Sequence, residues 1–287
     1  MARSKRHHYL PRFYTKGFAD TDGLLFVYDK SKDLVLKVKK SPKSIFYGWD
    51  RNTVAVHGEP NDQIEKTYAA LDDLIARSLT EVLKSGKLTT ENLTSLILFT
   101  TQLKWRTPKA DQHFNSIKDE LNQQDLRIKI ALENKDSDEY STMLKYIEES
   151  PMFKESKRII LSFLALQSTS QFEAYLKFSL INTNPVFPAL IGDNPVLEQP
   201  GGTFGELNDF ILPLSRSCTL IYKKGLQKGV NNALFFWQRD LTMIEFADQY
   251  VGCSDQKHLE RVVSAYRAVN KDGKGDELIK YLFHYIQ

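Results

Sequence analysis

The sequence predicts an α+β protein with a mainly antiparallel sheet, in which strands and helices are segregated along the chain. Three features support this class: strand-like segments near the start, a long central block with helical periodicity, and a return to strand-like segments before the last helices. Strict alternation of strands and helices would instead indicate a parallel sheet. The order therefore favours a sheet built from an N-terminal hairpin and later strands, with a large helical block beside it.

The first 60 residues are expected to be mostly extended. Residues 1–18 are predicted to be irregular, because the residue before Pro11 is disfavoured in a helix. Residues 24–29 and 34–38 are rich in β-forming side chains and flank a polar turn, which predicts a β-hairpin. A short strand is expected at residues 54–56.

The remaining elements follow from the period of the apolar positions and from the residues that end each run. Helices are predicted at residues 61–84, 90–106, 109–132 and 153–167, with short helices before the last of these. Strands are predicted at 172–181, 187–191, 210–215 and 219–222, and the last helices at 231–250, with a break at Gly252, 256–269 and 278–285. We expect one domain over residues 1–287 with a helical insertion at about 61–168.

Composition points to a soluble protein of the cytoplasm with no membrane partner. No run of about 18 apolar residues is present, and such a run would be needed for a transmembrane helix. Cys218 and Cys253 are the only cysteines, and neither lies in a CxxC motif. A disulfide framework and a thiolate zinc site are therefore not expected.

The segment HHYLPRFY at residues 7–14 is the strongest candidate for a functional site. Adjacent residues of an extended segment point to opposite faces, so one of His7 and His8 can enter a cleft while the other packs. An imidazole can act as general base or metal ligand, and the Arg12 guanidinium can hold a carboxylate or a phosphate. Alternatively, both histidines anchor the N-terminus by hydrogen bonds to strand carbonyls.

Two further segments supply candidate site residues. Asp193 and Asn194 follow an apolar run, where a carboxylate often serves as metal ligand or general base. The alternative is an Asx-turn in which Asp193 bonds its own backbone. Arg106 lies at the end of an apolar helix, where it would either hold an anion or simply complement the helix dipole.

Other residues are weaker candidates. Glu65 could face the cleft as an acid. The remaining histidines stand alone and are expected at the surface or in helix caps rather than as ligands. The chain has no phosphate-loop motif, no dinucleotide glycine fingerprint and no HExxH motif, which disfavours the corresponding enzyme classes.

Four segments together resemble one known family. They are His7 to Tyr14 with Phe18, Lys104-Trp105-Arg106-Thr107-Pro108, Ile191-Gly192-Asp193-Asn194-Pro195-Val196, and Leu212-Pro213-Leu214-Ser215. Their order resembles the bacterial family catalogued as domain of unknown function 4238, whose members begin with a His-Tyr-x-Pro motif. The resemblance extends from His7 to about Tyr250 and implies no particular activity. The family pattern more often has Ser or Thr where this chain has Gly192.

The first functional hypothesis is a hydrolase or nuclease acting on phosphoesters or nucleic acid, in the setting of phage defence or mobile-element conflict. His7 or His8 would be the base, Asp193 a ligand or orienter, and the two arginines would hold the anion with Asn194. Between Arg3 and Lys43 the chain has eleven Lys or Arg residues against four Asp residues. This basic stretch would follow a nucleic acid, with Tyr14, Phe46 and Tyr47 as aromatic contacts, or it is only a solvated face. If a divalent metal is the cofactor, His8 and Asp193 are its expected ligands.

The second hypothesis is a non-enzymatic binding or interaction protein. In this case the N-terminal motif is a structural latch, and Arg12 pairs with Asp193. Both hypotheses make the same spatial prediction, namely that residues 7–12 lie against the turn at residues 192–195.

Overall fold

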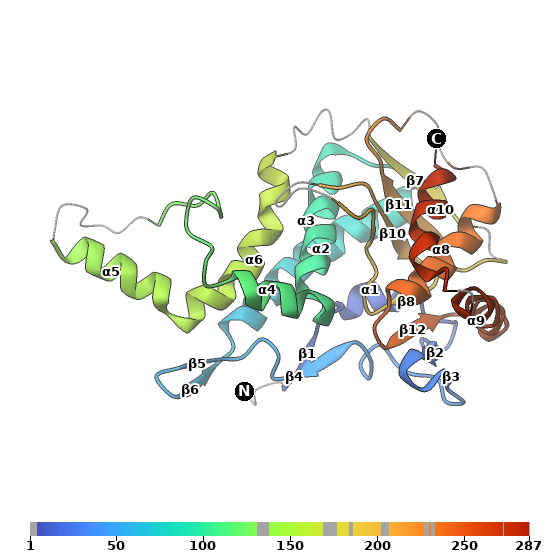
Figure 1. Cartoon of the computed structure of the whole chain (residues 1–287), viewed down its shortest axis with the longest axis horizontal. Coiled ribbons are helices and arrows are strands. Elements are labelled where there is room, and N and C mark those ends of the chain that lie inside the picture. The colour runs from blue at the N-terminus through green and yellow to red at the C-terminus, as the bar shows by residue number, and fades with distance from the viewer. Residues whose placement is uncertain are drawn as a thin grey trace.

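The α+β class is confirmed by the computed structural model (Figure 1). The structure describes residues 5–130, 138–168, 177–183, 186–201, 207–226, 230, 233–271 and 273–286. The central helices lie on one side of the molecule, and most strands lie on the other side with the C-terminal helices (Figure 1). Every strand pairing in these residues is antiparallel.

Two four-stranded sheets take the place of the single expected sheet. The first has the order β3-β2-β12-β8, formed by Leu34–Val35, Phe26–Asp29, Tyr250–Cys253 and Ile191–Gly192. The second has the order β7-β11-β10-β9, formed by Phe178–Asn182, Cys218–Tyr222, Phe210–Ser215 and Leu197–Glu198. The predicted N-terminal hairpin is β2-β3, and it joins later strands through β12 as expected.

The N-terminal motif is held by a small separate sheet. Strand β1 (Arg6–His8) pairs with β4 (Tyr47–Trp49), so that His7 lies opposite Gly48 and His8 opposite Tyr47. A second small sheet pairs β5 (Val54–Val56) with β6 (Glu59–Asn61), which confirms the strand predicted at 54–56.

Helix α1 (Arg12–Lys16) corrects the expectation that residues 1–18 are irregular throughout. Proline restricts the residue before it, but its own fixed φ suits the start of a helix. Pro11 occupies the N-cap of α1, and the helix begins at the next residue.

The central helices begin and end where the sequence signals them. Helix α2 (Gln63–Ser85) ends at Gly86, which adopts the left-handed conformation with φ of 66°. Helix α3 (Thr90–Arg106) begins with a reciprocal capping box between Thr89 and Asn92. Helices α5 and α6, which span Asp138–Glu149 and Pro151–Ser168, complete this block, and α5 projects away from the rest of the molecule (Figure 1).

The helix predicted at 109–132 is wrong for most of its length. A 3-10 turn at Pro108–Ala110 leads into α4 (Asp111–Ile117), and no regular helix follows in residues 118–130. The Asn122 side-chain oxygen accepts hydrogen bonds from the backbone N–H groups of Gln124 and Asp125. Asn and Asp side chains compete with helical hydrogen bonds in this way and favour turns.

The C-terminal region differs from its prediction at one point. Helix α8 (Ala233–Phe246) is shorter than expected, and strand β12 occupies the place where only a break at Gly252 was predicted. Helices α9 (Gln256–Lys271) and α10 (Leu278–His284) agree with the prediction, and short 3-10 turns occur at Lys30–Lys32 and Gly275–Glu277. Of the strand predicted at 172–181, residues 172–176 lie outside the described residues, and of that predicted at 187–191 only Ile191 is in a strand.

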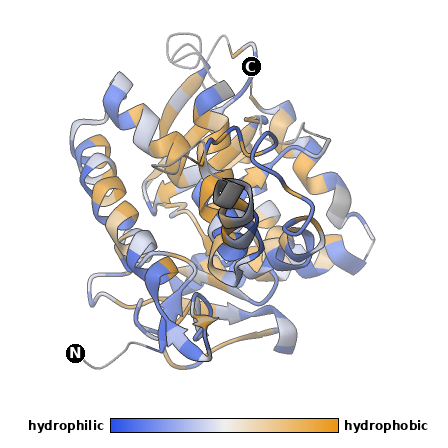
Figure 2. Cartoon of the chain, turned by 90° about the vertical axis from the view of Figure 1, so that its left-hand side faces the viewer, coloured by the Kyte–Doolittle hydropathy of each residue, from blue (hydrophilic) through white to orange (hydrophobic). Residues whose placement is uncertain are grey.

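One hydrophobic core joins the helices to the second sheet. Leu79 of α2 and Phe99 of α3 belong to the same buried cluster as Phe210 and Leu212 of β10. Hydrophobic residues gather on the strands and on the helix faces that cover them (Figure 2). No helix in the described part of the chain combines the length and the apolar character needed to cross a membrane. The single-domain organisation stays a prediction.

A substitution at Gly192 would test how closely α8 packs on β8. A Cβ atom at this position would lie 3.0 Å from the Met243 sulfur and 3.2 Å from the Ala247 Cβ. We expect Gly192→Ser to lower the free energy of unfolding by about 1–3 kcal/mol, because overpacking forces neighbouring groups apart. Urea denaturation would measure this, with the exposed Ala69→Ser in α2 as control. Equal stability of Gly192→Ser and wild type would contradict the prediction.

Candidate functional site

His7 is fully buried and acts as an anchor for the loop that follows β4. Its Nδ1 accepts a hydrogen bond of 3.0 Å from the backbone N–H of Asn52. The side-chain amide of Asn52 donates in turn to Glu65, at 2.6 Å, and the Glu65 carboxylate lies 4.0 Å from His7. Glu65 therefore helps to support this loop, and His7 anchors the loop through the backbone N–H of Asn52.

His8 lies on the other face of β1, as the alternation of an extended segment predicts. Its ring packs against Tyr47, with 5.7 Å between centroids. Burial lowers the pKa of His8 to about 4; a hydrogen bond to the Lys43 backbone opposes this, and the charges of Arg12 and Arg106 add to it. Because the buried Nε2 has no partner in the described residues, we infer that Nδ1 makes the Lys43 bond and that Nε2 keeps a free lone pair.

Arg106 is buried where α3 ends, and its charge is neutralised within the fold. One guanidinium nitrogen donates to Asp72 of α2 at 2.7 Å, and the group lies 4.4 Å from the centre of the Tyr68 ring. Burial raises the pKa of Asp72, although Arg106 acts to lower it. Arg106 thus has a structural partner, and its Nε is without one among the described residues.

Five residues of β1, α2 and the C-terminal end of α3 carry buried polar atoms without a hydrogen-bond partner in the described residues, and we call these five residues the His8–Arg106 cluster. Its members are His8, Tyr68, Gln102, Arg106 and Thr107. Atoms without a hydrogen-bond partner in the described residues are His8 Nε2, the Tyr68 hydroxyl, both amide atoms of Gln102, Arg106 Nε and Thr107 Oγ1. Buried polar atoms are normally paired, and one left unpaired costs about 1–3 kcal/mol. The N-terminal motif and the end of α3 therefore both carry unused hydrogen-bonding capacity, and the charge of Arg106 acts on His8.

Asp193 has a different role from the one that the catalytic hypothesis gives it. Its carboxylate accepts hydrogen bonds from the backbone N–H groups of residues 248, 249 and 250, at 2.8, 2.7 and 2.9 Å. Burial raises its pKa, although these hydrogen bonds lower it. Asn194 donates to the carbonyl of Phe246 at 3.3 Å. Both residues hold the loop between α8 and β12, so the expected Asx-turn with its own backbone is corrected to a clamp on a distant loop.

The other candidates, Arg12 and the aromatic residues Tyr14, Phe46 and Tyr47, differ in how exposed they are. Arg12 is exposed in the first turn of α1, and the Asp193 carboxylate is bound by backbone amides, so the expected Arg12–Asp193 pair is not formed. Tyr14 is completely buried, and its hydroxyl donates to the Pro213 carbonyl at 2.6 Å. Phe46 is also buried. Tyr14 and Phe46 are therefore not exposed for stacking on a nucleic acid, whereas Tyr47 is partly exposed.

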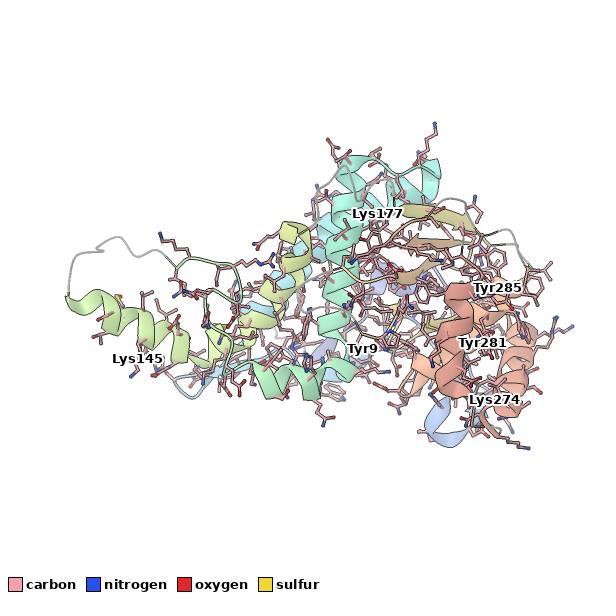
Figure 3. The ribbon with its side chains drawn as sticks, turned by 45° about the horizontal axis from the view of Figure 1, so that its top comes forward. Tyr9, Lys145, Lys177, Lys274, Tyr281 and Tyr285 are labelled. Carbon is pink, nitrogen blue, oxygen red and sulfur yellow. The ribbon has the colours of Figure 1, made fainter. Side chains whose placement is uncertain are left out.

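Tyr9 is a buried residue of the N-terminal motif. Burial raises the pKa of Tyr9, and the charge of Asp193 raises it further. The Arg51 guanidinium lies 6.0 Å from the centre of the Tyr9 ring. Figure 3 shows Tyr9 in the middle of the molecule, between the central helices and the C-terminal ones. The charge of Asp193 therefore acts on Tyr9, and the approach of residues 7–12 to residues 192–195 stays a prediction.

A cleft of about 520 Å³ opens beside Tyr9, and we call it the aromatic cleft. Its lining contains the aromatic residues Tyr9, Phe46, Tyr47, Trp49 and Tyr250, the basic residues Lys32, Lys40 and Arg51, and one carboxylate, Asp29. Three positive charges against one negative charge make the cleft attractive to anions. Sequence reasoning named Tyr47 but missed Trp49 and Arg51; the run Tyr47-Gly48-Trp49 with Arg51 beside it was the available signal.

A second buried polar group lies between α8 and α9. Asp240 accepts from Arg239 at 2.9 Å and lies 2.8 Å from His258 Nε2, and all three side chains are essentially inaccessible. Arg239 also donates to Thr183 and Thr219 of the neighbouring sheet. The expectation that His258 lies at the surface or in a cap was wrong about its burial, and the group fastens α8 to α9 and β11.

No three His, Cys, Asp or Glu side chains gather into a metal-binding group anywhere in the residues that the structure describes. The divalent metal, with His8 and Asp193 as ligands, stays a prediction. Tyr68, Gln102 and Thr107 were missed by sequence reasoning. Gln102 could have been found, because it is a polar residue on the apolar face of α3.

The fold and the site define an α+β protein in which an N-terminal His-Tyr motif is packed against a central pair of helices. The chain belongs to the family described as protein of unknown function DUF4238, whose model matches residues 6–240. Searches of curated proteins and of solved structures gave no match. The matched range includes the motif, the cluster and most of the aromatic cleft, but ends before β12.

The neutral state of His8 predicts how stability depends on pH. The unfolded chain binds a proton at His8 near pH 6.5, whereas the folded chain does so only near pH 4. Stability contributed by neutral His8 is therefore lost as the pH falls from about 6.5 to about 4. We expect His8→Asn to lose less stability than wild type between pH 7 and pH 5 in urea denaturation. The exposed His57→Asn is the control, and an unchanged pH dependence for His8→Asn would refute the assignment.

The unpaired atoms of the His8–Arg106 cluster predict an unusual mutational response. Tyr14→Phe removes a bonded hydroxyl and should lower the free energy of unfolding by about 1 kcal/mol. Tyr68→Phe removes a buried hydroxyl that has no partner in the described residues, so stability should stay the same or rise. Chemical denaturation of both variants measures the contrast. A loss for Tyr68→Phe as large as that for Tyr14→Phe would contradict the prediction.

Proposed function

We propose that this protein binds single-stranded nucleic acid in the aromatic cleft and that the N-terminal motif is the structural latch that builds the cleft. The observation that carries the proposal is the combination of aromatic rings with a positive lining in one cavity of about 520 Å³. Proteins that bind single strands use this combination, because the bases stack on aromatic rings while basic groups follow the phosphates.

Exposed aromatic rings provide the stacking surface. Trp49 is 61% exposed, and its ring meets that of Tyr47 at 85° with 5.8 Å between centroids. The Arg6 guanidinium lies 5.2 Å from the centre of the Tyr47 ring and 5.1 Å from that of Trp49. An exposed tryptophan ring is hydrophobic surface in contact with water, and such surface is typical of binding sites. The indole ring and the guanidinium group can both stack on a nucleic-acid base.

Basic groups in the cleft differ in how far they are neutralised. Lys32 is paired with Asp29 at 2.9 Å, and Arg51 is paired with Asp111. Lys40 has no acidic partner among the described residues, so its charge is the one most available to a phosphate. Two of the eleven basic residues between Arg3 and Lys43, namely Lys32 and Lys40, line this cleft. Phosphate contacts of this kind make binding depend on salt concentration.

The latch interpretation gives the motif residues a role in shaping the cleft. His7 anchors the loop that carries Arg51, and Asp193 fixes Gln249 and Tyr250, and all three of these held residues line the cleft. The backbone N–H of Tyr9 donates to the carbonyl of Phe46 at 3.0 Å.

Hydrolysis of phosphoesters has less support. Among the described lining residues there is no histidine, and Asp29 is already bonded to Ser31 and Lys32. The free lone pair of His8 is the one observation that favours it.

Fluorescence anisotropy with labelled single-stranded RNA and DNA would test the proposal. We expect Trp49→Ala to weaken binding by about 1–3 kcal/mol, or about 5- to 150-fold, through loss of stacking. Lys40→Gln should make the slope of log K against log salt concentration shallower by about one, because one phosphate contact is lost. Tyr281→Ala in α10 is the matched control. Tyr281 is also an exposed aromatic residue, but it does not line the aromatic cleft (Figure 3).

Absence of binding at low salt, or equal effects of Trp49→Ala and Tyr281→Ala, would reject the proposal. The same samples incubated with Mg²⁺ test hydrolysis directly. Strand cleavage that disappears in His8→Asn, with its fold intact by circular dichroism, would favour the hydrolase hypothesis instead.

A further inference from the structure

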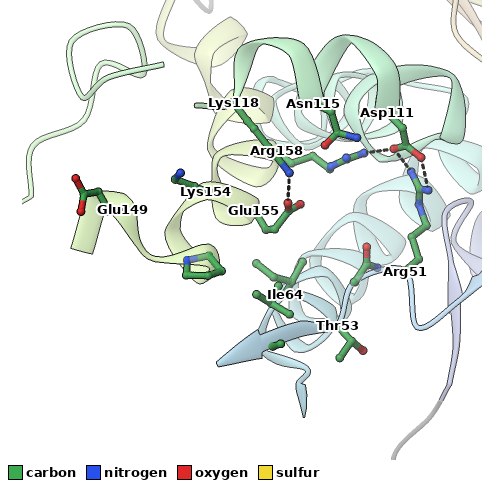
Figure 4. Close-up of a pocket in the computed structure, with 14 residues that line it drawn as sticks. Arg51, Thr53, Ile64, Asp111, Asn115, Lys118, Glu149, Lys154, Glu155 and Arg158 are labelled. Atoms are coloured by element: carbon green, nitrogen blue, oxygen red, sulfur yellow. Dashed lines mark hydrogen bonds and ion pairs between the residues drawn. The ribbon is translucent and has the colours of Figure 1, made fainter. Parts of the chain in front are cut away.

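A second cavity, separate from the aromatic cleft, lies among the central helices. Its volume is about 530 Å³, which is in the range of small-molecule sites. Its walls come from the loop and strand at residues 51–55, from α4 and from α6 (Figure 4). Ile64 and Val54 provide an apolar part, and charged side chains make up most of the rest.

Two arginines in this cavity share one carboxylate. Arg51 forms a two-point pair with Asp111, with distances of 2.6 and 2.5 Å, and Arg158 donates to the same carboxylate at 2.6 Å. Figure 4 shows both guanidinium groups directed at Asp111 from opposite walls. Two positive charges against one negative charge leave one charge without compensation.

The other charged groups of the cavity do not supply the missing negative charge. Lys118 is paired with Glu155 at 2.5 Å, so these two neutralise each other. Lys154 is paired with Asp119, which does not line the cavity. Four basic and three acidic side chains line the cavity in total, and Glu149 lies at its far end (Figure 4).

Both arginines are held in place by contacts that do not involve a ligand. Arg51 donates to the carbonyl of Arg106 at 3.2 Å. Arg158 donates to the carbonyl of Trp105 at 3.0 Å, and its guanidinium lies 4.2 Å from the centre of the Phe114 ring. Their side chains are only 16% and 12% exposed, so an anion would meet them with little water in between. Such pre-organised, partly desolvated guanidinium groups bind oxyanions well.

We propose that this cavity is a binding site for a small phosphate-bearing molecule, with Arg158 and Arg51 holding the phosphate and Asp111 keeping the two guanidinium groups aligned in its absence. Guanidinium forks match phosphate oxygens in geometry. The apolar part formed by Ile64 and Val54 would contact the remainder of the molecule. This inference does not depend on nucleic-acid binding in the aromatic cleft.

Isothermal titration calorimetry with inorganic phosphate tests the site. We expect saturable binding by wild type, about tenfold or more weakening in Arg158→Gln, and tighter binding in Asp111→Asn. The opposite signs follow because the first change removes a donor and the second removes the competing carboxylate. Lys280→Gln is the matched control, since Lys280 is exposed on α10 and does not line the cavity.

Asp111→Asn leaves two arginines without their partner and lowers stability by itself. For this variant, phosphate should raise the melting temperature by more than it raises that of wild type. Trp49→Ala should bind phosphate at this site as wild type does, which separates this proposal from the proposed function. Absence of saturable binding, equal affinity of Arg158→Gln and wild type, or a smaller phosphate effect on Asp111→Asn than on wild type would overturn it.

Discussion

The hydrogen bond from the Asn52 backbone N–H to His7 Nδ1 is the contact on which the N-terminal half depends. It joins β1 to the loop after β4 at a point where the imidazole is fully buried. A bond of this kind contributes about 1 kcal/mol when formed, but a buried partner left without it costs more. Because β1 is only three residues long, this side-chain contact specifies the position of the segment as much as the strand pairing does.

From this contact a chain of charged pairs extends into the helical block. Arg51 follows the anchored backbone and reaches both Asp111 and the end of α3, and Asp111 reaches Arg158 of α6. Breaking such a partly buried pair by removing one member is typically costly, up to about 3–5 kcal/mol for a fully buried pair. Arg51 also lines both cavities, so the two proposed binding sites share this residue.

Sequence reasoning succeeded where the signal was local. The ends of α2 and α3 are determined by Gly86 and by the Thr89–Asn92 capping box, which lie within a few residues of each end. The convergence of His8, Asp193 and Arg106 on one cleft joins segments far apart in the chain and stays a prediction.

Apart from the helix predicted at 109–132, which fails at a local turn, the failures arose where the determinant is distant in the chain. Strand β12 is defined by pairing with β2, more than 200 residues earlier, and no local pattern encodes that partner. In the same way, Asp193 bonds a loop about 55 residues later, so its role as a clamp was not visible in the turn itself.

The state of each polar group limits what the site can do chemically. The Nδ1 atom of His7 and both carboxylate oxygens of Asp193 accept hydrogen bonds from the backbone, so both residues act as anchors. His8 keeps a free nitrogen, but a pKa of about 4 makes that nitrogen a weak base at neutral pH. General bases work best when their pKa lies near the working pH. His8 is therefore better suited to accept a hydrogen bond than to remove a proton, and this favours a protein that binds its ligand over one that cleaves it.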